Sequence, residues 1–517
     1  MISGIFRLIA AGLALLAAQP ALAEWHEASS DHFVIYADDK DTDLRKFAEN
    51  LERYHSAMAI LTGQKIEKPS PSNRVTIFVV GDQRDMRALS GSRTIGGFYI
   101  PRAGGSRAFV QEIRNQKGYP HFSTIVMLHE YAHHFLISAS RFPMPRWWNE
   151  GAAEFFAAAT FNDDGSLLIG RAAQHRGGEL AFAEPVHVRE LLDPELYEKQ
   201  KGKKYDAFYG KSWLLYHYLI FSKDRVGQMG QYRRNLFEGM KPLAAGEAAF
   251  GDLDVLEREL EVYLRGRRFM MVPLGADKLS TGSPIALRKL PAGEAAIMPL
   301  VIRSQRGVDA EEAAKILPEV RAIAAKYPDD AGVLAALAEA EYDAGNNAEA
   351  IAAADRAIAA DPSRPNAYVQ KGYALFRQAG EAEDQAAAYE AAMKPFEALN
   401  AIENDHPLPL IYYYRSFAER GAAPPESARS ALEYASRLAP FDQALQVNTG
   451  MMLIKEGKPE IARSFLAPVA ANPHGGGAAE QAKRILDLLA KAPPGGAIKM
   501  DVVPAETGSS GAAETGE

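Results

Sequence analysis

One short segment of the sequence combines the residue types that a catalytic metal site needs. The pattern H-E-x-x-H occurs once, as His129, Glu130 and His133. On a helix the two histidines lie one turn apart, so their ring nitrogens can reach one ion at about 2 Å. Glu130 lies beside them and can take a proton from a bound water as a general base. The motif therefore predicts a zinc site suited to hydrolysis.

A second segment offers the third ligand. Glu150 and Glu154 follow Pro145, which starts helices well, and they share one face of the expected helix because they are four residues apart. A helical hairpin closed by residues 138–144 would return Glu150 to the level of the two histidines. Two histidines and one carboxylate suit zinc and leave a position for water, whose pKa falls toward about 7. We therefore predict one zinc ion per chain, with Glu154 accepting the outward N–H of a ligating histidine.

Together the two segments resemble the gluzincin clan of zinc metallopeptidases, in which H-E-x-x-H precedes a segment like the Asn-Glu-Gly-x-Ala-Glu that begins at Asn149. The stretch Pro-Arg-Trp-Trp-Asn-Glu-Gly from Pro145 is similar to the peptidase-MA-like domains of exported bacterial proteins, several of which also carry tetratricopeptide repeats. The resemblance covers about residues 30–270 for the peptidase and about residues 310–490 for the repeats.

The resemblance also implies a role for each matching residue. His129, His133 and Glu150 would bind zinc. Glu130 would act as the general base, and Glu154 would orient a ligating histidine. The alternative reading, in which these are surface charges on unrelated helices, has to produce two compatible motifs by chance.

The negative charge that develops on a substrate carbonyl needs a second donor besides zinc. The resemblance points to Tyr209, because gluzincin aminopeptidases carry a tyrosine followed two residues later by a lysine, which is Lys211 here. Tyr205 is an alternative donor. His217 is a further candidate by analogy with thermolysin, although its apolar helix favours a packed position.

One departure from the resemblance concerns the amino terminus of the substrate. Gluzincin aminopeptidases carry a Gly-x-Met-Glu-Asn segment whose glutamate holds the free amine, whereas the corresponding region Gly96–Pro101 has no acid. A substrate strand could still pair beside this region. The sequence therefore favours an endopeptidase over an aminopeptidase.

The expected fold class is α+β, with an N-terminal mixed sheet, a helical zincin-like subdomain and an α-helical repeat solenoid. Strands are predicted at Phe33–Ala37 and Val75–Val80, and an amphipathic helix at Asp41–Leu61. From Ser123, which can serve as an N-cap, the helical period dominates to about Phe269. Two further short strands are expected at Gly96–Ile100 and Arg107–Val110.

The repeats are predicted from the spacing of prolines that close helical segments. Successive separations are 34, 45, 33 and 33 residues, and a period of 34 built from two helices is typical of tetratricopeptide repeats. Small residues recur where paired helices approach closely, as at Ala350 and Ala357 and again at Ala428 and Ala435. An alanine-rich bundle with accidental spacing is the alternative. We expect the repeats to hold another polypeptide and to supply no metal ligand. The prolines are Pro328, Pro362, Pro407, Pro440 and Pro473.

Composition divides the chain into units and excludes several classes of function. The 58 basic and 66 acidic residues give a net charge of −8, which argues against a nucleic-acid partner. The chain has no cysteine, which excludes disulfides and thiolate-ligated metals. The expected units are a signal peptide (1–23), the α/β part (24–118) and helical part (119–270) of a peptidase domain, a linker or small irregular subdomain (271–308), repeats (309–491) and a disordered tail (492–517).

The first 23 residues predict export. An apolar run at Leu8–Ala18 follows Arg7 and is too short to span a bilayer, and Ala21–Ala23 supplies a small-x-small cleavage pattern. An uncleaved anchor is the alternative. We expect a periplasmic or secreted protein without a transmembrane segment in its mature form.

Two functions remain after these exclusions. The first is an exported zinc-dependent metallopeptidase that cleaves a peptide or protein substrate, with a protein partner or substrate held by the repeats. The second is a non-catalytic adaptor whose zinc site is structural or vestigial. Glu130 favours the first function, because a structural zinc site has no use for a general base.

Overall fold

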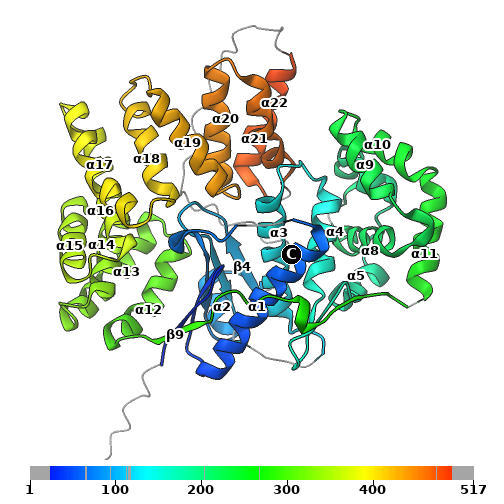
Figure 1. The fold of residues 1–517 in the computed structure, drawn as a ribbon, viewed down its shortest axis with the longest axis horizontal. Coiled ribbons are helices and arrows are strands. Elements are labelled where there is room, and N and C mark those ends of the chain that lie inside the picture. The colour runs from blue at the N-terminus through cyan, green and yellow to red at the C-terminus, as the bar shows by residue number, and fades with distance from the viewer. Residues whose placement is uncertain are drawn as a thin grey trace, which may run out of the picture.

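The structure is a computed structural model that describes residues 24–64, 67–93, 95–111, 113, 118–202, 204–266, 268–472 and 474–491 (Figure 1). The predicted signal peptide and the predicted disordered tail lie outside the described residues. Within the described part, no helix is both long and apolar enough to cross a membrane.

A six-stranded mixed sheet forms the N-terminal part, as predicted. Its strand order is β4-β5-β3-β2-β1-β9, in which β2, β3 and β5 are parallel and the other three strands are antiparallel to their neighbours. The strands are β1 (His26–Ser29), β2 (Phe33–Ala37), β3 (Val75–Val79), β4 (Gly97–Ile100), β5 (Arg107–Val110) and β9 (Ala286–Lys289). Residues of β2 alternate between buried and half-buried, and helix α1 (Asp41–Thr62) packs its apolar side into the same core. The short helix α2 (Gln83–Ser90) follows β3.

Two helices carry the predicted site. Helix α3 (Phe122–Ala139) contains the H-E-x-x-H segment and packs beside β4, and α4 (Arg146–Ala157) returns antiparallel to it. The N-cap of α3 is His121 and not Ser123, because His121 has extended backbone angles and Phe122 already follows the helix. The expectation for Ser123 is therefore wrong by two residues.

Gly151 sets how closely α4 approaches α8 (Phe208–Phe221). A Cβ added at Gly151 would lie only 2.4 Å from the backbone oxygen of Ser212. Only a glycine permits this approach, which holds α4 with Glu150 turned toward α3. The remaining elements of this half are β6 (Thr160–Phe161), β7 (Leu167–Ile169), α5 (Gly177–Phe182), α6 (Val188–Leu192), α7 (Pro194–Gln200), α9 (Gln228–Phe237), α10 (Pro242–Phe250) and α11 (Leu253–Gly266).

The segment 271–308 is neither the linker nor the small irregular subdomain that the sequence predicted. Strand β8 (Val272–Leu274) pairs with β7, β9 extends the main sheet beside β1, and α12 (Ala292–Gln305) follows directly. Strand β8 contains a proline and β9 has a single large apolar residue, so neither shows the pattern of a strand in the sequence, and only their pairing partners reveal them. The segment is therefore part of the fold, because it contributes one strand to each of the two sheets.

The C-terminal half is an array of antiparallel helix pairs, which confirms the prediction of helical repeats. Ala350, Ala357, Ala428 and Ala435 are fully buried between paired helices. The longer interval of 45 residues falls on α16 and α17, which have 16 and 18 residues against 13 and 14 in the preceding pair. The helices are α13 (Ala310–Lys326), α14 (Ala331–Asp343), α15 (Asn347–Ala360), α16 (Pro365–Gly380), α17 (Gln385–Ile402), α18 (Pro407–Ala418), α19 (Glu426–Leu438), α20 (Gln443–Lys455), α21 (Pro459–Ala471) and α22 (Gly476–Lys491).

The repeat array curves around the sheet and ends above α3 and α4 (Figure 1). It is fastened to the loops of the sheet: the backbone N–H and hydroxyl of Ser72 donate to Glu403 at 2.9 and 2.8 Å, and the N–H of Ala103 donates to Asp442 at 2.8 Å. Ala103 is buried in the hydrophobic core of the repeats. The two halves therefore share an interior, and the repeats are not a separate module on a flexible tether.

Candidate metal centre

Four side chains converge on one point: two come from α3, one from α4 and one from the segment between α21 and α22. The ligand atoms of His129, His133, Glu150 and His474 all lie within 4.8 Å of one another. Oε2 of Glu150 is 3.4 Å from Nε2 of His129 and 3.4 Å from Nε2 of His133, and the two Nε2 atoms are 3.0 Å apart. The structure therefore brings the three predicted ligands together and adds a fourth residue from the repeats.

The chemistry of this donor set fits a metal ion. Glu150 is fully buried, and neither of its carboxylate oxygens has a hydrogen-bond partner within the described part of the chain. Its close neighbours are the ring nitrogens of His129, His133 and His474, none of which makes a hydrogen bond of good geometry to the carboxylate. A buried carboxylate without hydrogen bonds is costly unless a cation compensates it. Three nitrogens and one carboxylate are a donor set that zinc accepts.

Local electrostatics favour the ionised forms of His129 and Glu150 in the absence of a cation. Burial by itself lowers the pKa of His129, but the carboxylates of Glu150 and Glu154 raise it to about 10. Burial by itself raises the pKa of Glu150, but the neighbouring His474 and His133 hold it well below its ordinary value. The carboxylate is thus held as the anion that a metal ion needs.

The outer nitrogens of both motif histidines are held by acceptors. Nδ1 of His129 lies 3.2 Å from Oε1 of Glu154, and Nδ1 of His133 lies 3.1 Å from Oδ1 of Asn149. With a metal ion bound, each Nδ1–H would donate outward and each Nε2 lone pair would face the centre. The structure places Glu154 at the position predicted for it, and it adds Asn149, whose place beside Glu150 in the sequence was an unused signal.

Glu154 is itself anchored by two residues that the sequence analysis missed. Nε2 of His175 lies 2.5 Å from Oε2 of Glu154, and the guanidinium of Arg176 donates to Oε1 at 2.7 and 3.0 Å. Both follow in the turn after β7, at positions with no recognisable spacing from either motif. Arg176 offsets burial and holds the pKa of Glu154 well below its ordinary value.

A cavity of about 110 Å³ opens in front of the centre. Glu130 and Tyr209 line it, together with Gly97 at the start of β4, an edge strand of the sheet. The negative charge of Glu150, together with burial, raises the pKa of Tyr209, whose hydroxyl therefore keeps its proton. The guanidinium of Arg176 lies 4.7 Å from the centroid of the Tyr209 ring. The predicted base and the predicted donor thus face the same space.

The other donors that the sequence suggested lie elsewhere. The hydroxyl of Tyr205, a residue 54% exposed, donates to Glu179 at 2.9 Å and does not line the cavity. His217 is fully buried and its ring contacts Tyr263 and the oxygen of Gly170, in the packed position expected of it. Lys211 is buried in an ion pair with Glu257. Among the tyrosines and histidines suggested as donors, Tyr209 is the one at the cavity.

The sequence predicted that the repeats supply no ligand, whereas the structure places His474 of the repeats among the residues that could hold a metal ion. This histidine lies 345 residues after His129, in the turn between α21 and α22. No spacing rule connects it to the motif, because only the docking of the last repeats over α3 brings it close. His134 lies at this junction: its Nδ1 is 2.5 Å from the Tyr99 hydroxyl and its ring centroid is 4.5 Å from that of Phe441.

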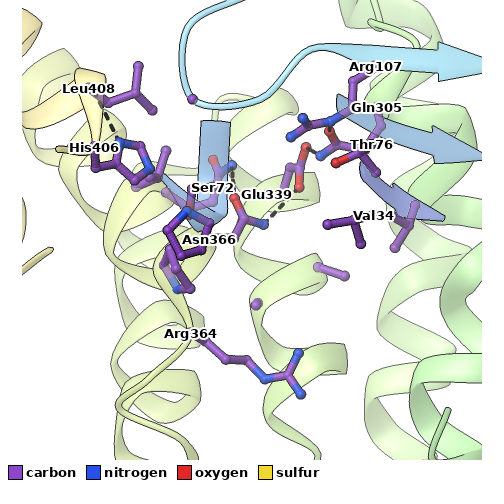
Figure 2. Close-up of a pocket in the computed structure, with 18 of the residues that line it drawn as sticks. Val34, Ser72, Thr76, Arg107, Gln305, Glu339, Arg364, Asn366, His406 and Leu408 are labelled. Carbon is purple, nitrogen blue, oxygen red and sulfur yellow. Dashed lines mark hydrogen bonds between the residues drawn. The ribbon is translucent and has the colours of Figure 1, made fainter. Parts of the chain in front are cut away.

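A larger cavity of about 1080 Å³ lies between the outer face of the sheet and the concave face of the repeats. Figure 2 shows Arg107 of β5 reaching Gln305 of α12, with its Nε donating at 2.7 Å. Gln305 in turn bonds Glu339, which also accepts from Asn366 at 3.1 Å. The lining is rich in polar and charged side chains from both halves.

The comparisons with known proteins concern the repeats alone. No protein-family model matches the chain, and no curated protein matches it in sequence. Among solved structures, the chain is similar to TTC0263, a thermophilic TPR protein of Thermus thermophilus, with 18% identity over 39% of this chain and 96% of that one at a TM-score of 0.30. It is also similar to MamA, with 14% identity over 39% of this chain and 99% of that one at a TM-score of 0.27. The repeat assignment therefore rests on the helix order and packing of this chain.

Proposed function

We propose that this protein is an exported zinc-dependent peptidase of the gluzincin kind, acting as an endopeptidase. The observation that carries the proposal is that His129, His133 and Glu150 surround one point while Glu130 lines the cavity in front of it. A purely structural zinc site would not need a carboxylate at that position.

When bound, zinc would supply a Lewis acid that polarises a substrate carbonyl and lowers the pKa of a water toward about 7. Glu130 takes the proton of the attacking water and passes it to the leaving amine. Tyr209, which keeps its proton, donates a hydrogen bond to the oxygen on which negative charge develops. Glu154 and Asn149 hold the two histidine rings in the orientation that presents Nε2.

The substrate approaches along the edge of the sheet. Strand β4 is an edge strand that begins at the cavity, so an extended peptide can pair with its backbone and pass in front of Glu130. A Cβ at Gly97 would lie 2.8 Å from the backbone oxygen of Phe109, so the glycine permits the close approach of β4 to β5 at the cavity. No acid of this strand, whose sequence is Gly-Phe-Tyr-Ile, meets a free amino terminus, which supports internal cleavage.

The test combines metal content with hydrolysis of an unfolded protein such as reduced casein. Wild-type protein should contain one zinc ion and cleave this substrate, and Glu130→Gln should keep the zinc and lose at least about two orders of magnitude in rate. The matched control is Glu195→Gln, because Glu195 is an exposed glutamate on α7. Equal rates for wild type and Glu130→Gln would refute the proposed mechanism.

A second candidate function is a non-catalytic adaptor. The large polar cavity between sheet and repeats favours it, because that surface can hold a polypeptide without any chemistry. If wild-type protein binds zinc, hydrolyses neither casein nor short peptides, and Glu130→Gln changes nothing, the adaptor with a structural zinc site replaces the peptidase.

A further inference from the structure

His474 reaches the metal centre from its accessible side. Its Nε2 lies 3.0 Å from Oε1 of Glu150, and its ring centroid is 5.1 Å from that of His133. Glu150 is completely buried, whereas the His474 side chain keeps 21% of its surface exposed. His474 also lines the cavity that contains Glu130 and Tyr209. It therefore occupies the side from which water and substrate would enter.

The number of protein ligands separates two classes of zinc site. Three protein ligands leave one position for water, whereas four close a tetrahedral site. His474 brings the number of converging protein ligands to four. Glu130 in the same cavity is useful only if one position is open. The centre thus has enough protein ligands to close a zinc site, and it also has the general base that only an open site can use.

We propose that His474 is a displaceable fourth ligand that holds the zinc centre closed, and that movement of the hairpin α21–α22 opens it. This inference rests on the proposed zinc peptidase and names the residue that regulates it. In the closed arrangement the enzyme is latent. A polypeptide that binds the repeats better in the open arrangement shifts the balance toward activity.

His474 is held by few hydrogen bonds, as expected of a ligand that can leave the metal. It lies between the end of α21 and the start of α22, where its backbone N–H donates to Oδ1 of Asn472 at 3.0 Å. Within the described residues its Nε2 has no hydrogen-bond partner, so its attraction to the carboxylate of Glu150 is what holds the ring in place. The hairpin also forms the end of the described repeat array, and a terminal repeat packs against a neighbour on one side alone.

The preceding helices are hydrogen-bonded to the sheet. Leu438 at the end of α19 and Asp442 before α20 accept hydrogen bonds from Asn73 and Ala103 of the sheet loops at 2.8 Å each. Between these anchors and His474 lies the turn from α20 to α21, where Gly457 has a φ of +73°. A small rotation about this turn lifts His474 and leaves the anchors in place.

Phe465 on α21 also contacts the peptidase half: the guanidinium of Arg141 lies 4.2 Å from the centroid of its ring. Arg141 belongs to the loop between α3 and α4, so this contact guides the hairpin over the centre. Arg141 is exposed while Phe465 is buried, so this single contact restrains the hairpin only weakly, and a bound polypeptide can offset it.

The test compares full-length wild type with His474→Ala and with His474→Gln, which keeps more of the side-chain volume. His187→Ala is the matched control, because that histidine is 63% exposed on its side chain and lies outside the cluster. Three properties are measured: zinc affinity by competition with a chelator, the response of the cobalt(II)-substituted centre to azide in its visible spectrum, and hydrolysis of a short peptide.

Removal of His474 should weaken zinc binding by roughly tenfold or more, since even outer partners of a ligand contribute about that much. The wild-type cobalt centre should ignore azide, the two variants should bind it, and their peptide hydrolysis should rise. Unchanged zinc affinity in both variants, or an azide response already present in wild type, overturns the inference. Absent hydrolysis with the expected zinc and azide differences instead refutes the peptidase and keeps His474 as a ligand.

Discussion

Replacement of Gly151 by alanine should disturb the metal centre without touching any of its ligands. The added Cβ would lie 2.4 Å from the backbone oxygen of Ser212 and 3.0 Å from Cβ of Tyr216. Ordinary carbon–oxygen contacts begin near about 3.4 Å, so α4 has to move from α8 by roughly 1 Å. Backbone cannot turn aside as a flexible side chain can, and such overpacking costs about 1–3 kcal/mol.

The same movement displaces Glu150, the residue before Gly151, relative to the histidines of α3. Metal–ligand distances tolerate only about 0.2 Å, so a shift of this size should weaken zinc binding substantially. We expect Gly151→Ala to lower the free energy of unfolding in urea by about 1–3 kcal/mol and to raise the zinc dissociation constant by at least about tenfold.

The control is Gly177→Ala. Gly177 is also helical, but a Cβ there meets no atom within 4 Å, so alanine should be neutral or stabilising by up to about 1 kcal/mol. Urea unfolding and chelator competition are measured on both variants and on wild type. If Gly151→Ala binds zinc as tightly as wild type and unfolds at the same urea concentration, the close approach of α4 to α8 does not position Glu150.

Three further outcomes follow from the structure. His133→Ala should weaken zinc binding by at least about tenfold in a chelator competition, because it removes one of the converging ligands, and equal affinity in variant and wild type would reject the site. Glu154→Gln should weaken zinc binding by about 10–100-fold in a chelator competition, since it removes the charge that Nδ1 of His129 faces; unchanged affinity would remove Glu154 from the centre. Burial and the charge of Glu339 raise the pKa of Asp343 from 3.8 to about 7, so between these values the folded protein holds a proton that the unfolded chain has lost. Its stability should therefore fall as the pH rises from about 4 to about 7, and Asp343→Asn should remove that fall, which urea unfolding at about pH 5 and about pH 8 would measure; an identical slope in the variant would contradict the shift.

Local patterns in the sequence predicted the parts of this protein that depend on short-range spacing. The i,i+4 spacing of His129 and His133 places both rings on one helical face, and the proline before α4 starts the helix that carries Glu150 and Glu154. Strand β2 and the start of α1 are where the apolar periods placed them. The repeats were readable because each helix pair closes with a proline and packs on small residues.

Tertiary contacts decided what no local spacing encodes. His474 joins the centre because the last repeats dock over α3. No sequence spacing between His474 and the motif predicts this docking. Strands β8 and β9 exist because the edges of two sheets offer them backbone partners, although their own residues do not show the apolar pattern of a strand. Tyr209 rather than Tyr205 faces the cavity because of the way α8 packs against α4. Helix and strand periods depend on residues that are neighbours in the sequence. The position of His474, the pairing at the sheet edges and the lining of the cavity depend on contacts between distant segments, which form only when the chain folds.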